Sequence, residues 1–326
     1  MFPTFISKLQ SKFDSALQSD GLTFIPTQVS HLESGSGVKF EIRLAPSLNK
    51  KPEKSNVESK TIKNDPFLPP YSPDLFVCES EAQNQGDSDD SYVIVLNKYC
   101  VVPRHFLMVT KAFKSQSSPP SPRDLLAVIN ILDQAHLTEP NSDWLSFYNC
   151  GPQSGASFQF IPIQHGENPL GSLIERSAPV KEEQVFNLLE LKFAHFIIKL
   201  PQANKSNNHG SNDGLLESII GERFMLLLDS MIDHLRHLPG SSSLEMNQLS
   251  YNIAITRSYM ILVPRSSEMV SSTGISINSL AVGAGMVLVK SQDQLDQLKH
   301  MGIDSVLAHV TFPVLTEFND PCLNEG

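Results

Sequence analysis

At its centre the chain reads Phe147-Tyr-Asn-Cys-Gly-Pro-Gln-Ser-Gly-Ala-Ser-Phe-Gln159. Apolar residues lead into this stretch and out of it, and two glycines and a proline lie between them. Two apolar strands joined this closely pair antiparallel, so the stretch predicts neighbouring strands of one sheet. Glycines also let backbone N–H groups approach a phosphate. The turn is therefore either a wide hairpin loop or a phosphate-binding loop, to which Asn149 and Ser157 would add side-chain hydrogen bonds.

Strands and helices alternate on both sides of this centre. Ser121, Pro122 and Asp124 form a helix start, with a capping hydroxyl, a proline at the first helical position and an acid three residues after the cap. Apolar stripes predict helices over 122–137, 215–235 and 291–298, and an amphipathic helix within 1–20. β-branched and aromatic runs predict strands over 92–96, 100–102, 106–110, 144–148, 158–163, 193–200, 251–256, 259–263 and 285–289. This order indicates an α+β fold, an antiparallel sheet with flanking helices.

Two stretches of the chain resemble each other. Ile94–Arg104 and Ile253–Arg265 both read as strand, basic turn, strand and Val-Pro-Arg, and the second stretch is two residues longer. Alternating apolar residues recur in any sheet. The match is therefore explained equally well by chance and by duplication of one unit of the chain. The shared Val-Pro-Arg favours duplication, and the sequence thus predicts two related halves. The polar stretch 202–214 is either a linker between them or an excursion within one domain.

Composition excludes several classes of protein. Of 326 residues, 40% are hydrophobic and 18 are Phe, which supports a sizeable core and excludes disorder throughout. The 25 Lys and Arg against 35 Asp and Glu leave a net charge of −10, so nucleic acid is not an expected partner. Four scattered cysteines show neither zinc-site nor disulfide spacing. The first 20 residues lack an unbroken apolar signal core and no apolar segment is long enough to span a bilayer, so we expect no membrane partner and a cytoplasmic location, with the nucleus as the alternative.

The central stretch resembles a known family. The pattern Asn149-x-Gly151-x-x-x-Gly155-x-Ser157, preceded by Asn97-Lys98 and a later Val-Pro, is similar to the histidine-triad-related nucleotidyl transferases. Within that superfamily the likeness is to the fungal diadenosine tetraphosphate phosphorylases, also called ATP adenylyltransferases. It covers nearly the whole chain, in blocks that keep the family's order: 44–48, 65–67, 96–110, 147–157, 193–196, 250–252, 263–266 and 285–290. The resemblance implies a histidine-triad-like fold, with an N-terminal phosphorylase domain over residues 1–190 and a C-terminal ATP adenylyltransferase-type domain over residues 191–326.

The resemblance also implies a reaction, phosphorolysis. An enzyme histidine attacks diadenosine tetraphosphate, a nucleotidyl-histidine forms, and inorganic phosphate then releases a nucleoside diphosphate, so that the products are ATP and ADP. Covalent catalysis divides one difficult displacement into two easier ones. The expected ligands are a dinucleoside polyphosphate, phosphate, ATP and ADP, with a divalent cation carried on the polyphosphate and no organic cofactor. We expect a monomer without a metal site of its own.

Substrate-binding residues follow from the resemblance, at the positions that match the family's motifs. Asn278-Ser279-Leu280 matches an Asn-Ser-Thr segment whose third hydroxyl is lost here. Without the resemblance, Met286 would be an ordinary core residue and Lys290 a surface charge at the end of a strand. The implied set is Lys51, Asn97, Lys98, Asn149, Gly155, Ala156, Ser157, Gln159, Asn278, Ser279, Leu280, Met286 and Lys290.

One part of the family's pattern is missing. In the family, Gly-x-Ser is followed by His-x-His-x-Gln, and the second histidine is the nucleophile. Here Ser157 is followed directly by Phe158 and Gln159, so both histidines are absent. The catalytic residue of this chain is therefore unknown.

No neighbouring histidine obviously replaces the nucleophile. His105 lies in a predicted turn, His165 in a predicted surface loop, and His195 in an apolar strand as a core residue. Two explanations stay open. Either the chain is a catalytically inactive relative, which keeps a nucleotide site or only the fold, or the sequence lost a short in-frame piece, for instance at a misplaced splice boundary.

Overall fold

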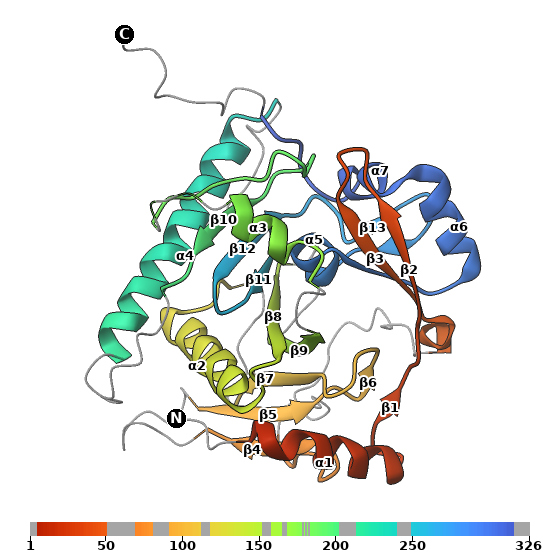
Figure 1. Cartoon of the computed structure of the whole chain (residues 1–326), viewed down its shortest axis with the longest axis vertical. Coiled ribbons are helices and arrows are strands. Elements are labelled where there is room, and N and C mark those ends of the chain that lie inside the picture. The colour runs from red at the N-terminus through yellow and green to blue at the C-terminus, as the bar shows by residue number, and fades with distance from the viewer. Residues whose placement is uncertain are drawn as a thin grey trace.

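One large antiparallel sheet runs through the molecule (Figure 1). The computed structural model describes residues 5–50, 69–80, 91–111, 118–151, 158–164, 168–177, 179, 181, 183–201, 213–239 and 249–315. Within them the large sheet has eight strands in the order β10-β12-β11-β8-β9-β7-β5-β4. In that order the strands are Phe196–Lys199, Tyr259–Pro264, Tyr251–Ile255, Ser142–Cys150, Phe158–Gln164, Phe106–Thr110, Tyr92–Leu96 and Phe76–Glu79. The predicted α+β fold on an antiparallel sheet is confirmed.

The large sheet contains the same unit twice. β7, α2 (Pro122–Thr138), β8 and β9 follow one another along the chain, and so do β10, α4 (Asp213–Arg236), β11 and β12. The strands of the first unit lie in the order β7-β9-β8, and those of the second follow in the order β11-β12-β10. The two units are therefore arranged symmetrically about the β8–β11 pair. Two related halves are therefore visible in the topology. The predicted domain boundary after residue 190 stays a prediction, and the sheet continues across it through that strand pair.

The predicted equivalence of Ile94–Arg104 and Ile253–Arg265 is wrong. β11 and β12 do form a hairpin, but β5 pairs with β4 and β7. The strand after the first turn is only β6 (Tyr99–Cys100), which pairs in parallel with β1 (Thr23–Phe24). In the topology the counterpart of β11 and β12 is the β8–β9 pair. Local sequence similarity misaligned the halves because the partner of a strand is set by the rest of the sheet.

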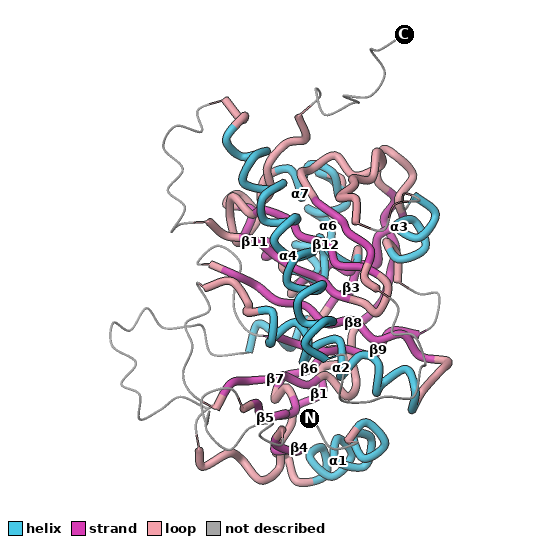
Figure 2. Tube along the Cα trace, turned by 90° about the vertical axis from the view of Figure 1, so that its left-hand side faces the viewer, coloured by secondary structure: helices cyan, strands magenta, loops and turns pink. Residues whose placement is uncertain are grey.

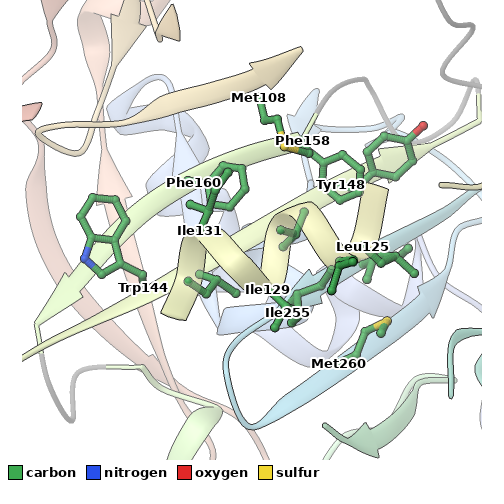
Figure 3. Close-up of a cluster of buried hydrophobic side chains, with 14 of the residues drawn as sticks. Met108, Leu125, Ile129, Ile131, Trp144, Tyr148, Phe158, Phe160, Ile255 and Met260 are labelled. Carbon is green, nitrogen blue, oxygen red and sulfur yellow. The ribbon is translucent and has the colours of Figure 1, made fainter. Parts of the chain in front are cut away.

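Helices cover one face of the large sheet. α1 (Ile6–Gln18), α2 and α4 bury their apolar stripes there. Figure 3 shows α2 beside the strands that carry Tyr148, Phe158 and Phe160. Figures 1 and 2 both place α1 next to β4, at an edge of the sheet. The three helices predicted within 1–20 and over 122–137 and 215–235 are confirmed.

A second, smaller layer covers part of the other face. Its three-stranded sheet has the order β15-β3-β2, and its apolar side chains share a core with the large sheet. β15 lies parallel to β3, which joins residues far apart in the chain. The sequence predicted β15 and α6 but not the other elements. The elements of this layer are β2 (Gln28–Glu33), β3 (Lys39–Leu44), α3 (Gly171–Ser177), α5 (Ser279–Ala284), β15 (Met286–Val289), α6 (Gln292–Met301) and α7 (Ile303–Ala308).

Side chains cap two of the predicted helices. The Ser121 hydroxyl accepts a hydrogen bond from the Asp124 N–H at 3.2 Å, and the Asp124 carboxylate accepts from the Ser121 N–H at 2.8 Å. The Ser291 hydroxyl accepts from the Gln294 N–H at 3.1 Å in the same way. Both starts were predicted from the sequence. None of the helices in the described ranges combines the length and the hydrophobicity needed to cross a membrane.

Candidate functional site

A buried cluster of polar side chains lies where the two units of the large sheet meet. Asn149 on β8 is the register partner of Asn252 on β11. Side chains alternate along a strand, and their neighbours Phe147 and Ala254 belong to the core of the second layer, so both amides face that layer. Arg265, directly after β12, and Ser279, at the start of α5, complete the cluster. The exposed fractions of Asn149, Asn252, Arg265 and Ser279 are 4%, 1%, 3% and 0%.

The side-chain oxygen of Asn149 accepts several hydrogen bonds. Asn252 Nδ2 lies 2.8 Å from Asn149 Oδ1, and the Ser279 hydroxyl and N–H lie 2.6 Å and 3.3 Å from the same atom. The hydroxyl also lies 2.9 Å from the Tyr148 carbonyl oxygen. Every side-chain hydrogen bond of Asn149 with the described residues is made by Oδ1, and Nδ2 donates to none of them.

Arg265 anchors the cluster from the other side. Its guanidinium donates to Asn252 Oδ1 at 2.5 Å. It also donates to three backbone carbonyl oxygens, those of Val310 at 2.9 Å, Ile277 at 2.9 Å and Ser267 at 2.7 Å. Burial lowers the pKa of Arg265 to about 10, against a smaller opposing effect of Glu268, so the group stays charged at neutral pH. A buried cation costs free energy unless its donors are satisfied, and here oxygen atoms of the protein accept from four of its five N–H groups.

α5 places Ser279 in this cluster. The Asn278 side chain accepts from the Leu280 N–H at 3.1 Å and caps the helix. Gly285, with φ of 73°, ends it. Gly283 brings the helix onto β11, since a Cβ at this position would lie 2.4 Å from Ala254 Cβ. Of the predicted segment 278–280, only Ser279 hydrogen-bonds to Asn149, while Asn278 is a helix cap and Leu280 is buried.

Gly283→Ala is expected to lower the free energy of unfolding by about 1–3 kcal/mol, because the added methyl overpacks the contact between α5 and β11. Urea denaturation followed by circular dichroism measures the change. Gly214→Ala in α4 is the matched control, since a Cβ there meets nothing within 4 Å. The control should be neutral or more stable by up to about 1 kcal/mol. Equal unfolding free energies for the two variants would contradict this account of α5.

Three more polar residues lie on or beside the same strands. Gln159 on β9 is the register partner of Phe147 and is partly buried, so its side chain shares a face with Asn149. Asn97 follows β5, and its Nδ2 lies 3.1 Å from Nδ1 of His105. The His105 ring centroid is 6.0 Å from that of Phe147. His105 is buried rather than an ordinary turn residue, at 5% exposure.

Some of the remaining predicted residues lie within the described ranges, and the others lie outside them. Lys98 is exposed, and its amine lies 5.8 Å from the centroid of the Tyr99 ring. Met286 is buried on β15, and Lys290 follows that strand with an exposed side chain. Lys51, Gly155, Ala156 and Ser157 lie outside the described residues, as does His165. The binding roles of the whole set stay predictions.

Sequence reasoning gave no role to Asn252 and Arg265. Both lie within family-like blocks, 250–252 and 263–266, but nothing in the sequence pointed to their contact with Asn149. A usable signal was present, because Asn252 is a polar residue in the otherwise apolar strand Tyr251–Ile255. Buried polar residues need partners, so such an asparagine implies a second polar group across the core.

His195 is a satisfied core residue, as predicted. Its Nε2 accepts from the Leu188 N–H at 2.7 Å, and its Nδ1 is 2.7 Å from the Phe193 carbonyl oxygen. Burial lowers its pKa to about 4. Both ring nitrogens are therefore used within the core of the second layer, and the imidazole is neutral at neutral pH.

Comparison with known proteins agrees with this fold over nearly the whole chain. The family described as the Ap4A phosphorylase N-terminal domain matches residues 3–182, and the ATP adenylyltransferase C-terminal domain family matches residues 189–313. Diadenosine tetraphosphate phosphorylase 2 of Saccharomyces cerevisiae is 29% identical over 94% of each chain, and protein APA1 of the same organism is 26% identical over 94% of each chain. The crystal structure of yeast Ap4A phosphorylase Apa2 in complex with AMP superposes with a TM-score of 0.76 at 25% identity, and covers 98% of this chain and 99% of that one. The chain therefore belongs to the Ap4A phosphorylase family, with an Ap4A phosphorylase N-terminal domain followed by an ATP adenylyltransferase C-terminal domain.

Proposed function

We propose that this chain binds dinucleoside polyphosphates and that its reaction is phosphorolysis of diadenosine tetraphosphate to ATP and ADP. Family membership supports the reaction class, and crystal structures of the yeast relative Apa2 contain AMP in one case and Ap4A in another. One observation at the site carries the proposal. Asn149 is almost fully buried and its Oδ1 already accepts from Asn252 and Ser279, whereas its Nδ2 donates to none of the described residues, and a ligand oxygen could accept from that donor.

A second candidate function is nucleotide binding without turnover. Phe158, which directly follows Ser157, is already the first residue of β9. Its ring is buried, with its centroid 4.5 Å from that of Tyr148, and its register partner is Met108. The position after Ser157 is thus a core position, and no histidine precedes it in the family's spacing. The 326-residue chain lacks the histidine nucleophile that the family resemblance implies.

The divalent cation stays a prediction. Among the residues that the structure describes, no group of three or more His, Cys, Asp or Glu side chains is arranged to hold a metal ion. We propose that the cation arrives on the polyphosphate and neutralises part of its charge. The monomeric state and the cytoplasmic location likewise stay predictions.

Incubation with diadenosine tetraphosphate and phosphate, followed by chromatography, tests the reaction, and calorimetric titration with AMP and with diadenosine tetraphosphate tests the binding. Phosphate-dependent formation of ATP and ADP is the result expected for phosphorolysis. Saturable binding without products establishes the second candidate. A chain that neither binds nor reacts would overturn both.

Sequencing of the transcript across the codons for Ser157 and Phe158 accompanies these assays. If extra codons for His-x-His are found, the phosphorolysis assay is carried out on the longer chain, and the 326-residue chain is its matched control. An unchanged junction would exclude catalysis through that histidine.

A further inference from the structure

We propose that Arg265 and Asn252 are positioning residues, which fix the side-chain amide of Asn149 so that its Nδ2 donates to an oxygen of the bound nucleotide. This inference rests on the proposed binding function and names the residues that prepare the site for it.

An asparagine side chain can present either of two faces. Its carboxamide has an acceptor oxygen on one side and an NH₂ donor on the other, and the two orientations have nearly the same shape. Only its neighbours decide which orientation is adopted. A binding site that needs a donor at Asn149 must therefore contain groups that hold the oxygen on the opposite side.

Arg265 decides the orientation of Asn252. A guanidinium has donors and no acceptor, so the atom of Asn252 that lies 2.5 Å from Nη1 must be the oxygen. The NH₂ group of Asn252 is thereby turned the other way, toward β8. It donates to Asn149 Oδ1 at 2.8 Å.

Asn252 in turn decides the orientation of Asn149, together with Ser279. The Ser279 backbone N–H lies 3.3 Å from Asn149 Oδ1. Like the NH₂ group of Asn252, it can donate a hydrogen bond but cannot accept one. Both therefore require an acceptor at this position, and Asn149 Oδ1 supplies it. The Nδ2 of Asn149 lies on the opposite side of the amide and has no acceptor among the described residues.

Arg265 is held firmly enough for this role. Three backbone carbonyls fix its guanidinium from three separate segments of the chain, at residues 267, 277 and 310. No carboxylate within the described ranges forms an ion pair with it, and the two N–H groups of Nη1 donate to Asn252 Oδ1 and to the Ile277 carbonyl oxygen. In a buried environment such charge-assisted hydrogen bonds are stronger than neutral ones.

Asn252→Asp separates positioning from packing. The carboxylate has the same shape and still accepts from Arg265, but it has no donor for Asn149. We expect affinity for AMP, measured by calorimetry, to fall by about 10- to 100-fold, the range for loss of one hydrogen bond to a charged ligand. Asn168→Asp is the matched control. Asn168 lies outside the cluster, and its Nδ2 donates to the Tyr259 hydroxyl at 2.9 Å. The affinity of the Asn168→Asp variant for AMP should therefore stay at the wild-type value.

A double variant tests whether Asn252 acts through Asn149. In the Asn149→Ala background, Asn252→Asp should change affinity no further, because the amide that it orients is gone. A loss of the same size in both backgrounds would assign Asn252 a merely structural role and overturn the inference. So would wild-type affinity in the Asn252→Asp single variant.

A chain that binds no nucleotide would refute the proposed function, but the inference would still be decided by nuclear magnetic resonance. The Asn149 side-chain NH₂ signals are identified by their loss in Asn149→Ala. In Asn252→Asp we expect one of these protons to move downfield, as the amide turns to donate to the new carboxylate. Asn149 proton signals that stay at their wild-type positions would contradict the orientation assigned here.

Discussion

Arg265→Met is expected to lower the free energy of unfolding by about 3–5 kcal/mol, because it leaves several neutral acceptors without this donor at about 1–3 kcal/mol for each one that is buried and unpaired. Methionine fills much of the same space but donates no hydrogen bonds. Asn252 Oδ1 and the carbonyls of Ser267 and Ile277 then lose this donor, while the Val310 carbonyl loses one of two and still accepts from the Ser266 N–H at 3.1 Å. Each unpaired buried acceptor carries a desolvation cost. Urea denaturation measures the change as a lower midpoint at unchanged slope.

Arg257→Met is the matched control for this variant. Arg257 forms an ion pair with Asp133 at 2.7 Å, and both side chains are partly exposed, at 30% and 25%. Pairs that reach solvent contribute about 1 kcal/mol or less. If the two methionine variants lose the same stability, the buried network is not what makes Arg265 important.

Acidification from pH 7 to pH 4 is expected to remove about 3 kcal/mol of stability through His195 alone. Burial lowers its folded-state pKa from 6.5 to about 4, which outweighs the opposing hydrogen bond to the Phe193 carbonyl. Between these two pH values the unfolded chain binds a proton that the folded chain does not. Stability therefore falls as the pH falls through this window, and it is fully retained above the unfolded-state pKa.

His195→Gln isolates this contribution. Glutamine can also donate and accept a hydrogen bond, but it does not titrate. The stability difference between wild type and variant, from urea denaturation at several pH values, should shift in favour of the variant as the pH falls from 6.5 to 4. Parallel curves for the two proteins would show that His195 titrates normally or not at all in this range.

Local sequence patterns were enough to locate many elements of this fold. The strands predicted over 92–96 and 106–110 coincide with β5 and β7, and Ser121 caps α2 as its spacing with Asp124 implied. Two predicted strands were too long, since 193–200 contains only β10 and 100–102 only the end of β6. Their remaining residues belong to no strand, and Phe193 makes an isolated bridge with Pro313. The extent of a strand is set by its neighbours as much as by its own residues.

The sequence did not show which strands, far apart along the chain, lie beside each other in the sheets. β3 alternates between apolar and polar residues, but its partners are β2 and β15, and β15 lies more than two hundred residues later in the chain. α5 has only six residues, too few to show a helical stripe. The two halves were misaligned for the same reason, because a strand, a turn and Val-Pro-Arg carry no information about which strand lies beside them.

In the candidate site too, some residues were predicted from the sequence and others were found only from the fold. Asn149 and Ser279 were predicted through the family resemblance, and the structure places them in contact. Asn252 and Arg265 gained a role only from the fold, because they approach Asn149 across the seam between β8 and β11. Lys51 and the glycine-rich turn lie outside the described residues, so their predicted roles are unchanged.

The pairing of β8 with β11 has a consequence for cooperativity. Each half of the large sheet would end in an unpaired strand edge without the other, and open edges of this kind promote aggregation. The two halves act as an internal dimer whose subunits share one covalent chain, and this covalent link keeps their effective concentration independent of dilution. Calorimetry should therefore record a single melting transition for the described core, because neither half can leave the other without exposing its inner edge.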